Sequence, residues 1–334
     1  MHLGRPSLKL RGALALTLLP ILLLSGCSAE DDALLVYSGR SEALLGPLVE
    51  KFEQESGIDV EVRYAGSAEL AAQLLEEGEN SPADVFLAQD AGALGAAAKA
   101  GLLTVIPDEI FSLVPSGYSA ADQSWVGVSG RARVLVYDPS KVSELPASIF
   151  DLEDASWQGR IGIAPTNASF QAFVTAMRIL HGDARTLAWL EAMKVNAVIY
   201  EKNGAILEAV EAGQLDAGLI NHYYWYARAK DVGQDQINSR LAQFQAADAG
   251  NLVNVAGVGI LNSTDAAEQF VSFLLSETGQ QYFAQETREY PLVAGISPAD
   301  ELTPLADIPT PAIDLSDLDT LAETLELIRQ AGLI

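Results

Sequence analysis

Short apolar segments alternate with amphipathic segments after residue 32, and this alternation restricts the possible fold more than any other feature of the chain. Three segments have the apolar or alternating pattern of strands, namely residues 34–37, 58–64 and 83–88. Three others repeat apolar side chains at helical spacing, namely residues 42–55, 67–77 and 91–100. An alternation of strand and helix predicts a parallel sheet covered by helices on both faces.

A second series of the same kind begins near Val126. Its strand-like segments are residues 133–137, 160–164, 198–200, 217–220 and 255–261. Its helical segments are residues 169–180, 186–193, 204–212, 266–283 and 318–330. Two series predict an α/β protein of two lobes, each a mainly parallel sheet covered by helices, with a ligand cleft between them. We expect lobe 1 to comprise residues 33–130 and 257–304, and lobe 2 to comprise residues 131–256 and 305–334.

The N-terminal segment has the pattern of an export signal. Three basic residues within the first eleven positions precede an apolar run at residues 13–24, which is too short to span a bilayer comfortably. The run ends in Leu24-Ser25-Gly26-Cys27, which resembles the lipobox of bacterial lipoproteins. We therefore predict a signal peptide at residues 1–27, a lipid on Cys27 and a tether at residues 28–32. An ordinary signal peptide with an incidental cysteine is the alternative.

Charge and cysteine content narrow the possible partners. Without residues 1–27 the chain carries 17 basic and 45 acidic residues, a formal charge of −28. So acidic a protein is unsuited to nucleic acid or to anionic lipid. Cys27 is the one cysteine in the sequence, so neither an intrachain disulfide nor a thiolate metal site is available. We expect a monomer held at the outer face of the cell membrane, or in the periplasm, by its lipid alone.

Adjacent tyrosines occupy a position where a strand is expected to end. Tyr223 and Tyr224 follow the apolar segment 217–220 directly after Asn221-His222. A helix that packs on a core spaces its aromatic residues at three or four, so we expect the two consecutive rings to point in different directions. A phenolate is a hard, anionic oxygen donor that suits Fe(III). The alternative is that both rings cover a hydrophobic crevice.

Other polar segments are predicted at comparable strand ends. They are residues 38–41, 88–90 and 165–169. The last of these opens a predicted helix, and the backbone N–H groups of a helix N-terminus attract anions. The sequence therefore places a candidate anion site beside a candidate metal site.

These segments resemble the ferric-ion-binding proteins of bacterial ABC iron importers. The resemblance covers nearly all of the chain after the signal, in the order Val36–Arg40, Ala83–Phe86, Ser129–Val134, Ala217–Trp225 and Glu289–Leu292. It implies a periplasmic-binding-protein fold of type II. It also implies a carrier that has no enzymatic activity, holds Fe(III) with phosphate or carbonate and delivers the iron to an ABC permease.

The resemblance assigns the metal to Tyr223 and Tyr224. Many members of the family add a histidine and a glutamate, and Ser41 and Gln89 occupy those positions here. Four neighbouring side chains are alternatives for the missing ligands: Glu42, Asp90, His222 and Tyr226. The anion is expected at Asn167, Ala168, Ser169, Asn203 and Asn221, with Arg131 or Arg133 as a further candidate. A helix cap at Asn203, ion pairs at the two arginines and a structural role for His222 are the alternatives.

Competing functions remain open at this level. The same fold could hold a phosphonate, thiamine or a polyamine instead of a metal. An exported hydrolase is the more remote alternative, because the sequence has no Gly-x-Ser-x-Gly or His-Glu-x-x-His motif and no free thiol after Cys27 is lipidated.

The lipid anchor is testable by one substitution. Cys27→Ala removes the sulfur that carries the lipid, so we expect the variant to appear in the soluble exported fraction with its ligand binding unchanged. Fractionation of cells that express the full chain measures this. Continued membrane attachment of the variant contradicts the prediction.

Overall fold

The computed structural model describes residues 33–299 and 301–334. The predicted signal peptide at residues 1–27, the lipidation at Cys27 and the tether at residues 28–32 lie outside the described residues. None of the helices within the described ranges is long and apolar enough to cross a membrane.

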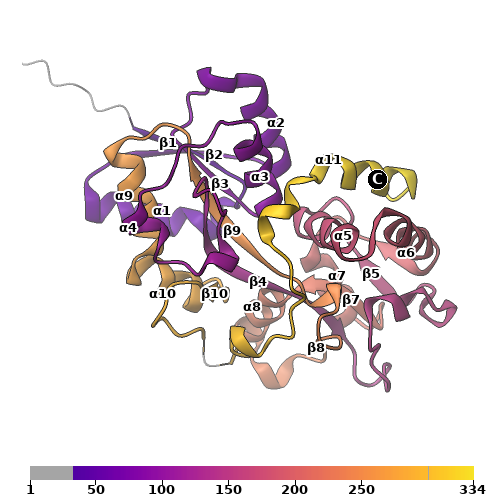
Figure 1. Cartoon of the computed structure of the whole chain (residues 1–334). Coiled ribbons are helices and arrows are strands. Elements are labelled where there is room, and N and C mark those ends of the chain that lie inside the picture. Colours follow the sequence, from indigo (N-terminus) through magenta and orange to yellow (C-terminus); the bar gives the residue numbers. More distant parts are fainter. Residues whose placement is uncertain (1–32, 300) are drawn as a thin grey trace, which may run out of the picture. The chain divides into compact units, whose positions relative to one another are not determined.

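The order of elements follows the predicted alternation (Figure 1). The strands are β1 (Leu34–Ser38), β2 (Val60–Tyr64), β3 (Val85–Ala88), β4 (Val126–Tyr137), β5 (Ile161–Ile163), β6 (Ala197–Ile199), β7 (Ala217–Asn221), β8 (Arg240–Ala242), β9 (Val253–Ile260) and β10 (Tyr290–Pro291). The helices are α1 (Glu42–Ser56), α2 (Ser67–Glu77), α3 (Ala91–Lys99), α4 (Asp108–Phe111), α5 (Ala168–His181), α6 (Asp183–Asn196), α7 (Asn203–Glu211), α8 (His222–Val232), α9 (Asp265–Leu275), α10 (Glu277–Gln285) and α11 (Leu321–Gln330), together with the 3₁₀ helix η8 (Leu315–Asp319).

The strands are hydrogen-bonded in the order β2-β1-β3-β9-β4-β7-β5-β6, and β8 and β10 also pair with β4. The outer strands are parallel: β1 pairs with β2 and β3, and β5 pairs with β6 and β7. The central strands β9 and β4 are antiparallel to their neighbours. The predicted α/β class is confirmed. Parallel pairing is limited to the outer strands, because β4 and β9 run antiparallel to the strands beside them.

Strand β4 is shared by two halves of this arrangement, one with strands β2-β1-β3-β9 and the other with strands β7-β5-β6. It is 12 residues long and buried up to its last residue, so it extends well before the predicted segment 133–137. It pairs with β9 from Val126 to Ala132 and with β7 from Arg133 to Tyr137. The change of partner within one strand joins the two halves through continuous backbone.

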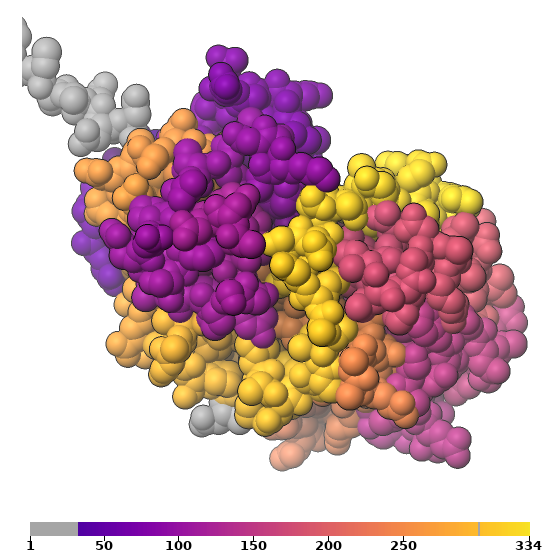
Figure 2. All heavy atoms as spheres, viewed as in Figure 1, coloured from indigo at the N-terminus to yellow at the C-terminus, as the bar shows by residue number. Residues whose placement is uncertain are grey.

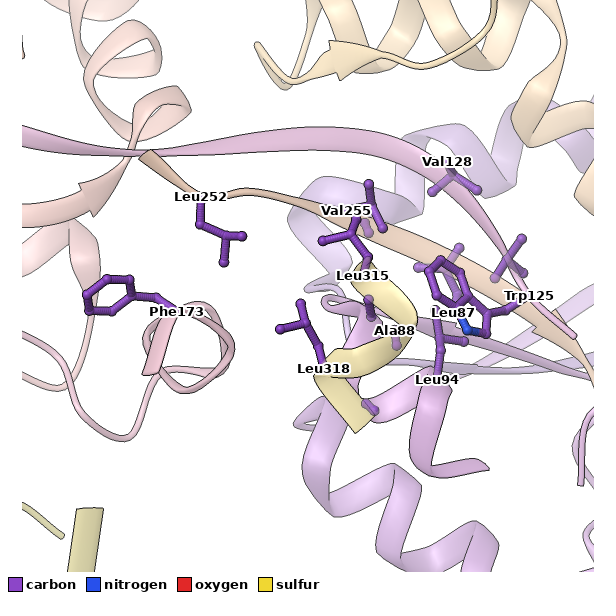
Figure 3. Close-up of a cluster of buried hydrophobic side chains, with 14 of the residues drawn as sticks. Leu87, Ala88, Leu94, Trp125, Val128, Phe173, Leu252, Val255, Leu315 and Leu318 are labelled. Atoms are coloured by element: carbon purple, nitrogen blue, oxygen red, sulfur yellow. The ribbon is translucent and has the colours of Figure 1, made fainter. Parts of the chain in front are cut away.

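The C-terminal residues contact helices of both halves. Leu315 and Leu318 of η8 are buried with residues of β9 and α3 in one core cluster (Figure 3). Glycine permits the close approach of η8 to α3, since a Cβ at Gly92 would lie 2.7 Å from the Leu318 oxygen. Helix α11 then packs on α5, where the hydroxyls of Thr175 and Thr324 lie 2.7 Å apart. Figure 2 shows these C-terminal residues, in yellow, between the purple and the pink segments. The segment therefore connects α3 and α5, whose N-termini hold predicted site residues.

Candidate metal and anion site

The paired tyrosines lie in the first turn of α8, directly after β7. Their rings stack with centroids 4.4 Å apart and planes 26° from parallel. The prediction that consecutive rings point in different directions is therefore wrong. Tyr224 lies against α7 at Gly204, where an added Cβ would be 3.8 Å from its Cδ1, an ordinary van der Waals contact. Tyr223 is buried and Tyr224 is half-buried.

The protonation of this pair follows from its surroundings. Burial raises the pKa of Tyr224, and the adjacent phenol of Tyr223 adds to the rise, while Arg131 and Arg40 oppose it. The Tyr224 phenol is therefore neutral near pH 7. A metal that binds this oxygen must displace its proton.

Two arginines on one face of β4 are connected to the predicted anion loop. Arg131 donates from Nη1 to Ser169 Oγ at 3.2 Å and from Nη2 to the Val255 carbonyl at 3.2 Å. Asn221 donates from Nδ2 to the same Ser169 Oγ at 3.0 Å and accepts at Oδ1 from Arg133 at 3.4 Å. The structure thus brings four of the predicted anion residues into one hydrogen-bonded network.

Several buried polar atoms of the two arginines, and of the predicted anion residue Asn203, have no hydrogen-bond partner among the described residues. They are Nε of Arg131, Nε and Nη2 of Arg133, and both side-chain amide atoms of Asn203. Burial lowers the pKa of Arg133 to about 9, with a further contribution from Arg131, so its side chain is still a cation at pH 7. Buried donors without acceptors are costly and uncommon in folded proteins. The cluster is therefore suited to an anion.

The remaining predicted anion residues are at helix starts. Asn167 caps α5, because its Oδ1 accepts the Ser169 N–H at 3.0 Å, and Ala168 is the first residue of that helix. Asn203 is the first residue of α7 rather than its cap, which is Lys202. The alternative of a helix cap at Asn203 is wrong, and its fully buried amide remains available to a ligand.

The predicted replacements for the missing metal ligands are less closely associated with the tyrosines. Asp90 is buried, caps α3 through the Ala93 N–H at 3.0 Å, and has its pKa raised mainly by burial. Gln89 is half-buried, and its backbone N–H donates to Ser67 Oγ at 2.9 Å. Ser41 and Glu42 are exposed at the start of α1. Within the described residues, neither Ser41 nor Gln89 hydrogen-bonds through its side chain to the tyrosines or to the arginines.

His222 has its ring in a different environment from the tyrosine pair. Its Nδ1 accepts the Ala132 N–H at 3.2 Å, and its ring stacks on Tyr290 with centroids 4.7 Å apart. With Tyr226 and Tyr290 it lines a cavity of about 220 Å³. Burial lowers the pKa of His222 to about 4, so the imidazole is neutral at pH 7. Because Nδ1 is used by the amide, this nitrogen is not free to bind a metal.

One buried ion pair received no role from the sequence. Arg40, two residues after the end of β1, donates from Nη1 and Nη2 to the two carboxylate oxygens of Glu289, both at 2.9 Å. Hydroxyls of Ser129 and Thr287 also donate to Glu289 Oε2, each at 3.1 Å. Both residues lie in segments that carry the family resemblance, but 249 positions separate them. Sequence patterns therefore gave no signal that they pair.

The donor set limits the kind of metal site that can form. Among residues 33–299 and 301–334, no group of three or more histidine, cysteine, aspartate or glutamate side chains could hold a metal ion. A metal at this site would therefore need donors beyond such a cluster, and the phenol oxygens of Tyr223 and Tyr224 are available donors. Phenolate oxygens favour a hard cation of high charge.

Comparison with known proteins places the chain among binding proteins. The family described as bacterial extracellular solute-binding protein matches residues 34–286. An Fe(3+)-binding periplasmic protein of Serratia marcescens is 34% identical over 331 residues, covering 97% of this chain and 98% of that protein. Iron-bound HitA from Pseudomonas aeruginosa has a TM-score of 0.85 and 38% identity, covering 90% of this chain and 99% of that one. A Trichodesmium protein (IdiA, FutA) in complex with iron and citrate has a TM-score of 0.76 and 28% identity, with coverages of 90% and 99%.

The mixed α/β fold and the buried polar site at the strand ends define a two-lobed solute-binding protein of the periplasmic type. The chain belongs to the bacterial extracellular solute-binding protein family. The predicted family and fold class are confirmed. This family binds solutes outside the cytoplasm, in agreement with the predicted export and with a carrier rather than an enzyme.

The Arg40–Glu289 pair yields a prediction about stability. Glu289→Gln keeps the shape of the side chain but leaves the Arg40 charge buried without a counter-charge, so we expect a loss of about 3–5 kcal/mol in the free energy of unfolding. Urea titration followed by circular dichroism measures the change. Glu286→Gln is the control, because Glu286 forms a partly exposed pair with Lys230 and its loss should cost less than about 1 kcal/mol. Equal midpoints for the two variants contradict the prediction.

Proposed function

We propose that this protein captures Fe(III) between two lobes, together with an anion, and delivers it to the permease of an ABC importer. The observation that carries the proposal is the stacked pair Tyr223–Tyr224 beside the buried arginines of β4. Relatives named for ferric iron binding, which match nearly the whole chain, support the same cargo. The lobes of the cleft are residues 33–130 with 257–304, and residues 131–256 with 305–334.

Tyr223 and Tyr224 supply the metal ligands from the protein. When both phenols lose their protons, their two negative charges leave one positive charge of Fe(III) uncompensated. Asp90 is the favoured candidate for a further ligand among the predicted replacements, since it is a buried carboxylate on which the charge of Arg131 acts. Ser41 and Gln89 are the remaining predicted metal residues. Their side-chain oxygens are neutral donors, and they would reach the iron only if closure of the lobes brought them near it.

Charge determines the class of the accompanying anion. Arg40 is neutralised by Glu289, but Arg131 and Arg133 form no salt bridge among the described residues. With one remaining charge from the metal, the closed site holds an excess of positive charge, which is costly in a buried environment. An anion of at least two negative charges offsets it. Phosphate and carbonate both meet this requirement, and Arg131, Arg133, Ser169, Asn203 and Asn221 supply the hydrogen bonds.

A second candidate keeps the anion and omits the metal. The donors of Arg133 and Asn203 that lack partners in the described chain favour an oxyanion such as a phosphonate. The same donors repel a polyamine or thiamine, because both ligands are cationic at pH 7. The optical spectrum of the loaded protein distinguishes an iron carrier from an oxyanion carrier, since only phenolate bound to Fe(III) gives a visible charge-transfer band.

The tyrosine assignment is tested by removing one oxygen at a time. Tyr223→Phe and Tyr224→Phe keep the stacked rings but remove a ligand atom, so each should abolish or shift the visible band. Each should also weaken Fe(III) binding at least tenfold, or about 1.4 kcal/mol. Competition against a chelator measures the affinity.

Tyr282→Phe is the matched control for the tyrosine variants. It loses a phenol that donates to the Leu44 carbonyl at 3.0 Å, in a different part of the structure. It should keep the band and the affinity of the native chain. Full coloured binding by the double variant at positions 223 and 224 overturns the assignment.

The anion assignment is tested at Arg133. Arg133→Met removes a buried charge that lacks a counter-charge, so the unloaded protein should be as stable as the native chain or more stable. Its iron binding should lose at least tenfold in affinity and most of its dependence on added phosphate or carbonate. Melting curves and chelator competition measure the two effects, with the exposed Arg228→Met as control. Unchanged anion dependence contradicts the assignment.

A further inference from the structure

The backbone of β4 has an unusual position at Ala132. The pairing of β4 with β7 places Arg133 opposite Asn221, so the same register continued by one residue would place Ala132 opposite His222. Strand β7 ends at Asn221, however, and His222 begins helix α8. Strand β10 pairs with β4 only at Ser129 and Gly130. Neither β7 nor β10 therefore supplies a backbone acceptor for the Ala132 N–H.

The side chain of His222 supplies the acceptor instead. Its Nδ1 lies 3.2 Å from the Ala132 nitrogen, and both residues are buried. An amide N–H can only donate, so Nδ1 carries no proton and the neutral imidazole carries its proton on Nε2. The imidazole thus continues the hydrogen bonding of β4 at the residue where the strand changes its partner from β9 to β7.

The same ring also contacts β10. His222 stacks on Tyr290 with planes 24° apart, and Tyr290 pairs with Gly130 of β4. The next residue along the chain is Tyr223. Its ring and the imidazole are arranged edge to face, with centroids 5.9 Å apart. His222 therefore connects β4 and β10 directly to the first turn of the helix that carries the tyrosine pair.

We propose that His222 is a positioning residue: its neutral Nδ1 fixes the first turn of α8 against β4, so that Tyr223 and Tyr224 are held in the geometry that receives the metal. The inference rests on the proposed function, because the positioned atoms are the proposed ligands. His222 does not itself bind the iron. Its two contacts, one to the strand backbone and one to Tyr290, restrain the direction from which the phenol oxygens enter the cleft.

Two substitutions separate the acceptor from the ring. His222→Phe keeps an aromatic ring to stack on Tyr290 but leaves the Ala132 N–H without its acceptor. His222→Asn loses the ring but places an amide oxygen on Cγ, where Nδ1 is attached in histidine. We expect the Phe variant to release Fe(III) to a chelator about tenfold faster, with a shifted or broadened charge-transfer band. The Asn variant should recover the native band and a release rate within about threefold of native.

The controls use the native chain and a distant histidine. His181→Phe changes an exposed histidine that packs on Phe150, and it should leave the band and the release rate unchanged. Nitrogen NMR of the native imidazole should show an unprotonated Nδ1 whether or not a variant folds. A protonated Nδ1, equal losses in the Asn and Phe variants, or native behaviour of the Phe variant overturns the proposal. A native chain that gives no iron band contradicts the iron assignment instead, and the NMR result still tests the hydrogen bond.

Discussion

The backbone hydrogen bonding of β4 is the constraint on which the rest of the structure depends. This one strand supplies hydrogen-bonding partners to both halves of the structure. It pairs with β9 along its first part and with β7 along its second. The side chains near the change of partner, at Ala132 and Arg133, are thereby placed at the junction of the two halves. Arg131 and Arg133, two residues apart, extend to the same face as alternation along a strand requires, and this face is where the anion loop and Asn221 lie.

Burial without a counter-charge gives this junction its chemistry. A buried guanidinium is tolerated when it is paired, as Arg40 is with Glu289. Arg131 and Arg133 instead donate some of their N–H groups to neutral oxygens. Nε of Arg131 and Nε and Nη2 of Arg133 have no partner in the described chain. Buried donors without acceptors lower the stability of the unloaded protein. The same donors would raise its affinity for an anion, because the anion supplies the missing acceptors. A metal alone would increase the positive charge of the site, which is the physical reason for proposing that an anion accompanies it.

The exterior and the site have opposite charge. Residues 28–334 carry a formal charge of −28 by sequence, whereas the buried centre is cationic. A long-range negative field favours the approach of cations, and in the proposed function the buried arginines bind the anion that accompanies them. The C-terminal segment adds a mechanical link between α3 and α5, through the close packing at Gly92 and the Thr175–Thr324 contact. Both helices begin at residues of the proposed site, Asp90 and Asn167.

The sequence by itself determined the alternation of strands and helices, the family, and the place of the two tyrosines after a strand, because apolar periodicity and local motifs are properties of adjacent residues. The tertiary structure alone decided which distant residues meet. The Arg40–Glu289 pair spans 249 positions, and the tyrosine rings stack where α8 packs against Gly204 of α7. The length of β4 and the antiparallel direction of β9 likewise depend on pairing partners far along the chain. Which nitrogen of His222 carries the proton depends on the hydrogen bond between its ring and the Ala132 N–H of β4. No local sequence pattern predicts this bond, since hydrogen bonds between separate elements form only after the chain has folded.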